Sequence, residues 1–158
     1  MSNMAVNVEI IGLNDLIRDF HKAGGDAEPL VTAALANSTQ HVTENVRAGA
    51  PHAFGTLQRS VLPEVRYPVG EVVVNESYGR DVEEGTGPHA VPHEAIERWA
   101  VKKGIPKGVS YAIVNAIKKR GTRAQPFFKP GWEKSQTYIE EQFDKVTERL
   151  LAVLSGGR

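Results

Sequence analysis

The residue pattern changes its period in the middle of the chain, and this change most constrains the fold. Residues 60–75 are rich in β-branched side chains, with one predicted strand over 60–67, a turn at 68–70 and a second strand over 71–75. This pattern is typical of a β-hairpin. Residues 6–11 alternate apolar and polar side chains, which predicts a short first strand. Helical patterns lie on both sides of the hairpin.

Those helical patterns predict the layer that covers the sheet. Asn14 suits the cap of a helix that runs to about Lys22, and Pro29 suits the first turn of a long helix that ends at residues 49–51. A last helix is predicted to start near Pro130. Its apolar face consists of Ile139, Phe143, Val146, Leu150 and Val153. We therefore predict an α+β fold, with a small curved antiparallel sheet packed by a long helix of the N-terminal half and a long C-terminal helix.

The length of 158 residues suits one domain with a single core, spanning residues 1–158. Residues 85–92 hold two glycines and two prolines, so we expect a loop there, and a mobile one. Helical patterns at 93–103 and 110–120 predict a helical insertion over residues 93–120. Residues 155–158 are predicted to be a frayed tail.

Charge is strongly segregated along a chain whose formal net charge is zero. Residues 98–129 carry nine basic side chains and no acidic one, whereas residues 71–97 carry seven acidic side chains and one arginine. The first interpretation is that these charges solvate the surface or pair within the monomer, as surface charges commonly do. The second is that they form complementary faces between identical subunits. A positive face that meets a negative face makes a heterologous contact, which can close into a ring.

The second interpretation predicts which residues lie at a subunit interface. The acidic segment around residues 80–97 would meet the basic segment around residues 102–123 of a neighbour, and the loop at 85–92 would become ordered on contact with the next ring. The interface candidates are Glu83, Glu84, Glu94, Glu97, Lys102, Lys103, Lys118, Lys119, Arg120 and Arg123.

No pattern of catalytic or ligand-binding residues is found in the sequence. The chain has no cysteine, which excludes disulfides, thiolate catalysis and cysteine-based zinc sites. His89 and His93 are four residues apart, but Pro92 makes a helical pair of metal ligands improbable. Glu83 and Glu84 are neighbours on a predicted strand, so their carboxylates would point to opposite faces. We expect no catalytic residue, no metal and no cofactor.

The sequence also lacks the features of an exported or membrane protein. The first residues have neither the basic region nor the apolar stretch of a secretory signal, and no window approaches the roughly 18 apolar residues of a membrane span. We expect a soluble, non-exported protein with no membrane partner.

Three stretches, at residues 50–61, 78–86 and 121–130, resemble conserved blocks of a known family. They are similar to the "Ala-Pro…Thr-Gly-x-Leu-x-x-Ser-Ile", "Tyr-Ala-x-x-Val-Glu-x-Gly-Thr" and "Pro-Phe-[Leu/Phe]-x-Pro" blocks of the head-tail joining or tail-completion proteins of long-tailed bacteriophages. The residues that carry the resemblance are Pro51, Gly55, Leu57, Ser60, Tyr78, Val82, Glu83, Gly85, Thr86, Pro126, Phe127, Phe128 and Pro130. Glu84 stands where that family usually has an aromatic residue.

The resemblance implies a structural protein of the phage neck and not an enzyme. It implies a homo-oligomeric ring, expected to be hexameric, that completes the tail and joins it to the DNA-filled head. Its neighbours would be the tail terminator or tail tube and the head-closure proteins. The protein would be located in the tail or neck of the virion, and in the host cytoplasm during assembly.

Two alternative functions remain open at this point. The first is a tail terminator that caps the tail tube, since such proteins are also small α+β ring formers. The second is a DNA-contacting assembly factor that uses the basic segment 98–129, because lysine and arginine contacts to phosphates need no sequence motif.

Overall fold

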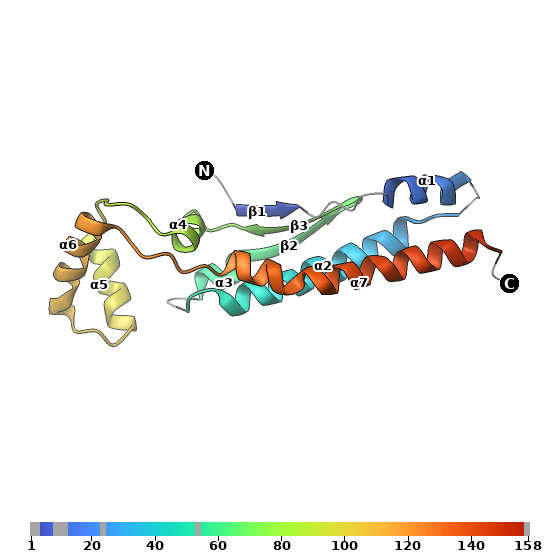
Figure 1. Cartoon of the computed structure of the whole chain (residues 1–158). Coiled ribbons are helices and arrows are strands. Elements are labelled where there is room, and N and C mark those ends of the chain that lie inside the picture. The colour runs from blue at the N-terminus through green and yellow to red at the C-terminus, as the bar shows by residue number, and fades with distance from the viewer. Residues whose placement is uncertain (1–3, 8–12, 23–24, 53–54, 157–158) are drawn as a thin grey trace.

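A computed structural model of the chain describes residues 4–7, 13–22, 25–52 and 55–156. The molecule is elongated, with a sheet and two long helices in its body and a pair of helices at one far end (Figure 1). In chain order the elements are β1 (Met4–Asn7), α1 (Leu13–Lys22), α2 (Glu28–Gly49), α3 (Thr56–Ser60), β2 (Val61–Arg66), β3 (Val69–Val74), α4 (Gly79–Glu84), α5 (His93–Lys102), the 3-10 helix η1 (Lys107–Val109), α6 (Ser110–Arg120) and α7 (Phe128–Leu154).

The described strands form one antiparallel sheet in the order β1-β3-β2. Val74 of β3 is paired with Met4 of β1 on one side and with Val61 of β2 on the other. Val61, Val72 and Val74 are buried. The predicted β-hairpin is confirmed. Residues 8–11 of the predicted first strand lie outside the described residues.

The two long helices pack together, and α7 buries Ile139, Phe143, Val146 and Leu150 of its predicted apolar face. Helix α2 packs on the sheet, and α7 runs along α2 (Figure 1). Gly131 of α7 lies against Val46 of α2, so closely that a Cβ atom on the glycine would be 2.7 Å from the Val46 backbone. The α+β fold is therefore confirmed. The core residues of α7 are Phe128, Ile139, Phe143, Val146 and Leu150.

Several expectations about local structure are wrong in detail. Helix α1 begins at Leu13, so Asn14 lies inside its first turn and is not its cap. The start of α7 at Phe128 agrees with the prediction of a start near Pro130. Val153, predicted on the buried face, is 59% exposed, since this end of α7 extends past the start of α2 (Figure 1). The short helices α3 and α4 were not expected, and Glu83 and Glu84 lie on α4 and not on a strand.

Candidate subunit interface

Helices α5 and α6 form a hairpin that is separate from the body (Figure 1). Gly104, with φ +71°, ends the first helix, and η1 leads into the second. Within the hairpin, the Ser110 hydroxyl donates to the carbonyl of Lys107 at 2.6 Å and lies 2.8 Å from Nε2 of His93. The His93 ring stacks on Tyr111. These contacts join the first turn of α5 to the start of α6.

The hairpin is joined to the body by two chain segments that pair with each other. Thr86 and Thr122 exchange backbone hydrogen bonds, each 3.1 Å long, and their hydroxyls lie 2.9 Å apart. Gly85 and Gly121 flank this pair with positive φ values of 74° and 77°. A Cβ atom on Gly121 would collide with the carbonyl oxygen of Thr86, so only glycine fits there without displacing the backbone. The expected loop at 85–92 is therefore anchored at its first residues.

The carboxylate of Glu83 binds the first turn of α7. It accepts hydrogen bonds from the backbone N–H groups of Phe127 at 2.7 Å, Phe128 at 2.8 Å and Lys129 at 3.0 Å. These donors have no partner inside the helix, and a negative charge is favourable at a helix N-terminus. Glu83 is thus engaged within its own chain. Its role in this structure is to cap α7, so its carboxylate is not a free charge at the surface.

The three stretches that resemble the phage family meet at this end of the body. Leu57 of the first stretch lies beside Gly79 of the second, 3.6 Å from the position of a glycine Cβ. The second and third stretches are joined by Glu83, by the Thr86–Thr122 pair and by a 2.8 Å hydrogen bond from the Gln125 N–H to the Val82 carbonyl. Segments far apart in sequence therefore build one local structure.

The other motif residues support this structure. Gly55 takes the left-handed conformation, with φ +67°, directly before α3, and the Ser60 hydroxyl donates to the Leu57 carbonyl at 2.7 Å. Phe127 and Phe128 are buried in the core. Pro126 is exposed and Pro130 half-buried.

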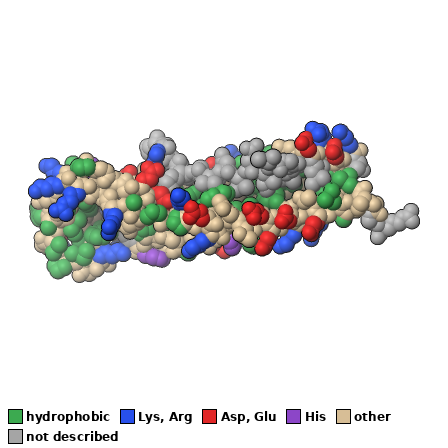
Figure 2. All heavy atoms as spheres, in the orientation of Figure 1, with side chains coloured by type: hydrophobic (Ala, Val, Ile, Leu, Met, Phe, Trp, Pro, Cys, Tyr) green, Lys and Arg blue, Asp and Glu red, His purple; other side chains and the backbone are tan. Residues whose placement is uncertain are grey.

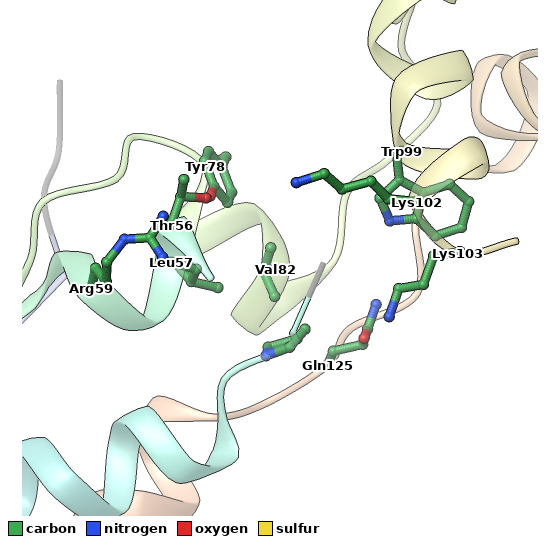
Figure 3. A pocket seen from close by; sticks show the side chains of 10 residues that line it. Thr56, Leu57, Arg59, Tyr78, Val82, Trp99, Lys102, Lys103 and Gln125 are labelled. Atoms are coloured by element: carbon green, nitrogen blue, oxygen red, sulfur yellow. The ribbon is translucent and has the colours of Figure 1, made fainter. Parts of the chain in front are cut away.

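A cleft of about 720 Å³ lies between the body and α5 (Figure 3). Leu57 of α3, Val82 of α4 and Trp99 of α5 supply its apolar surface. Lys102 and Lys103 reach toward it from α5, on the side opposite Tyr78. The cleft continues into a second hollow of about 630 Å³ that is also apolar. The second hollow is lined in part by Ile96, Trp99, Ile113 and Ile117 of the hairpin, all of them half-buried.

The predicted acidic interface residues lie on two helices, Glu83 and Glu84 on α4 and Glu94 and Glu97 on α5. Glu84 forms an exposed ion pair with Arg80 at 3.1 Å, and Glu97 forms one with Lys107 at 3.3 Å. Glu94 is exposed on the first turn of α5. Pairs of this exposure contribute little to stability. Part of the acidic segment is thus paired inside the chain, as the first interpretation of the charge pattern predicts.

The predicted basic residues lie at the far end of the molecule. Lys118, Lys119 and Arg120 are exposed in the last turn of α6, and Arg123 lines the second hollow. Figure 2 shows Lys and Arg side chains gathered over the end formed by α5 and α6. Residues 93–120 hold seven basic and two acidic residues, so the hairpin carries a formal charge of +5 and the rest of the neutral chain −5. The basic residues that are clustered in the sequence are therefore also clustered at one end of the structure.

Within the described ranges, no group of three or more His, Asp or Glu side chains could hold a metal ion. No helix among the described residues is long and apolar enough to cross a membrane. Comparisons of the chain with protein-family models, with curated proteins and with solved structures found no match.

Proposed function

We propose that this chain is a structural subunit of a phage or prophage virion, which assembles as a ring in the neck, completes the tail and joins it to the DNA-filled head. Three stretches resemble blocks of proteins with that role, and the folded chain brings the three together. Contact between the three stretches in the folded chain supports the proposal more strongly than their resemblance in sequence alone.

The observation that carries the proposal is the projecting hairpin with its incompletely covered apolar face. Ile96, Trp99, Ile113 and Ile117 line an open hollow, and only Ala100 among the apolar side chains described in the hairpin is fully buried. Apolar surface gathered in a hollow and surrounded by charges is typical of protein–protein contact sites. A subunit that must bind copies of itself and other neck proteins needs such a surface.

The separation of charge favours contact between identical subunits. Residues 93–120 carry a formal charge of +5 and the rest of the chain −5, and Figure 2 shows Lys and Arg side chains gathered at the hairpin end. When the positive part of one copy meets the negative part of the next, the contact is heterologous, and a closed ring follows when the rotation per subunit divides a full turn. A hexamer is the size that the family resemblance implies.

The proposed role is tested by electron microscopy of lysates from the source phage or prophage after deletion of this gene. Joining or completion predicts DNA-filled heads beside separate tails of normal length. Overlong tails would instead support the tail terminator. Infectious, intact particles would contradict both roles.

The exposed basic turn of α6 favours a second candidate, a DNA-contacting assembly factor. Lys118, Lys119 and Arg120 are consecutive and exposed. Phosphate contacts would make retention of the protein on DNA fall steeply with salt, by close to one power of the salt concentration per contact. Retention that does not depend on salt, or no retention in dilute buffer, would exclude this candidate.

A further inference from the structure

The last turns of α7 present apolar side chains that the described part of the chain does not cover. Leu151 is 51% exposed and Leu154 37%, although Leu150 beside them is fully buried. Asp144, Glu148 and Leu151 follow one another at spacings of four and three, so they lie along one face of the helix, with Leu154 at its edge. Asp144 and Glu148 are exposed. This end of α7 is therefore an amphipathic helix with an acidic and apolar stripe.

The cleft between the body and α5 is also apolar, but the charge beside it is positive. Its surface is apolar at Leu57, Val82 and Trp99, and Lys102 and Lys103 bring positive charge to its side (Figure 3). Its volume of about 720 Å³ lies within the range of roughly 300–1,000 Å³ that is usual for binding pockets. A cationic border also suits the end of a helix, since the last carbonyl groups of a helix carry partial negative charge.

A chain cannot bring its own α7 end to its own cleft. The C-terminal end of α7 lies at one extreme of the elongated molecule, beside α1, and α5 and α6 lie at the other extreme (Figure 1). Any contact between the two surfaces must therefore be made between two copies of the chain.

We infer that the cleft beside Trp99 receives the C-terminal turns of α7 from a second copy of this chain. Leu151 and Leu154 would enter the apolar surface as helix anchors, in the manner of a helix bound in a groove. Lys102 and Lys103 would meet Asp144 and Glu148. Charge complementarity favours the end of α7 as the bound segment, because its acidic side chains are opposite in sign to the lysines of the cleft and both surfaces are apolar. The inference deepens the proposed function and rests on it, since it names the contact by which the ring grows.

The proposed contact is head to tail, so reversing the charge of either surface should change the oligomeric state in a defined way. Lys102→Glu with Lys103→Glu reverses the cleft, and Asp144→Lys with Glu148→Lys reverses the helix end. Each variant alone repels itself at every contact and is expected to be monomeric, while the wild type forms rings. Mixed together, each variant offers the other a cleft and a helix end of opposite charge, so both contacts are attractive. The equimolar mixture should therefore form rings in which the two variants alternate. All four changes in one chain restore the rings.

The measurement is the native mass of each protein and of the equimolar mixture, at one concentration at which the wild type is assembled. Glu140→Lys with Lys134→Glu is the matched control on α7, and it should assemble as the wild type does. Circular dichroism must show unchanged helical content in every variant. Trp99→Ala and Leu151→Ser supply an uncharged test, and each should weaken assembly at least about tenfold, as loss of an interface anchor does.

The outcomes separate this inference from the proposed function. Wild-type rings together with variants that assemble equally well would overturn the inference and leave the ring in place. Charge-reversed monomers that the mixture and the fourfold variant fail to rescue would also overturn it. A wild type that stays monomeric at all concentrations would overturn both.

Discussion

Oε2 of Glu83 lies 2.7 Å from the backbone nitrogen of Phe127, across 44 residues of sequence. The same carboxylate also receives the N–H groups of Phe128 and Lys129. It fixes α4 to the first turn of α7, at the point where the two segments of the hairpin join the body. The orientation of the hairpin therefore depends on a bond between residues that are distant in sequence.

Loss of this carboxylate should destabilise the body of the protein. Glu83→Ala leaves three N–H groups near buried phenylalanines without their acceptor, which should lower the free energy of unfolding by about 1–3 kcal/mol. Chemical denaturation measures the change. The matched control is Glu84→Ala, next to it on α4, which removes only an exposed ion pair with Arg80 and should cost less than about 1 kcal/mol. Equal losses for both variants would contradict the capping role of Glu83.

The fold is partly predictable from the sequence, and the limits have physical causes. Helices α2, α5, α6 and α7 contain enough turns for a 3.6-residue period to emerge, and the β-branched residues of β2 and β3 mark the hairpin. Helices α3 and α4 have five and six residues, too few for a period. Glu83 of α4 accepts hydrogen bonds from residues 127–129, which are 44 to 46 residues away, and nothing near Glu83 in sequence signals that contact.

The candidate interface was predictable as a charge pattern but not as a surface. The sequence shows which residues are basic, and the structure places them on a hairpin separate from the body. It also reveals that Glu97 pairs with Lys107 in the same chain. The acidic and apolar stripe at the end of α7 is not predictable in the same way, because the spacing of apolar residues indicates the buried face and not which exposed residues a partner would contact.

The pair of segments at the base of the hairpin should not tolerate a side chain at Gly121. Gly121→Ala places a Cβ atom against the Thr86 carbonyl and on a backbone with φ +77°. We expect a loss of about 1–3 kcal/mol in local stability and faster cleavage by proteases in residues 85–92. Gly87→Ala is the control, because no atom lies within 4 Å of its Cβ position. Cleavage of both variants at the wild-type rate would show that the Thr86–Thr122 pair does not hold the hairpin.

Reversal of the basic turn of α6 should impair assembly without unfolding the subunit. Lys118, Lys119 and Arg120 are exposed, so their replacement by Glu should leave the free energy of unfolding within about 0.5 kcal/mol of the wild type. We expect the triple variant to lose oligomerisation or tail attachment, scored by native mass and by restoration of the deleted phage. Unchanged assembly and full restoration would remove this turn from the interface.

The Ser110 hydroxyl should hold the hairpin together locally. Ser110→Ala removes its bond to the Lys107 carbonyl and its contact with His93 in a buried position. The expected result is faster hydrogen exchange over residues 93–120, with unchanged exchange in α2 and α7. Ser155→Ala, which removes a similar bond in the exposed end of α7, serves as the comparison. Equal protection of the hairpin in Ser110→Ala and the wild type would contradict this role.

The native mass of the purified chain at low and at high salt tests most directly the claim that the chain assembles through its charged hairpin. At low salt we predict a closed oligomer, expected to contain six subunits of 17.3 kDa each. At about 1 M salt, where charges are screened beyond roughly 3 Å, the same sample should shift toward smaller species. A mass of one subunit at every concentration and salt would contradict the account.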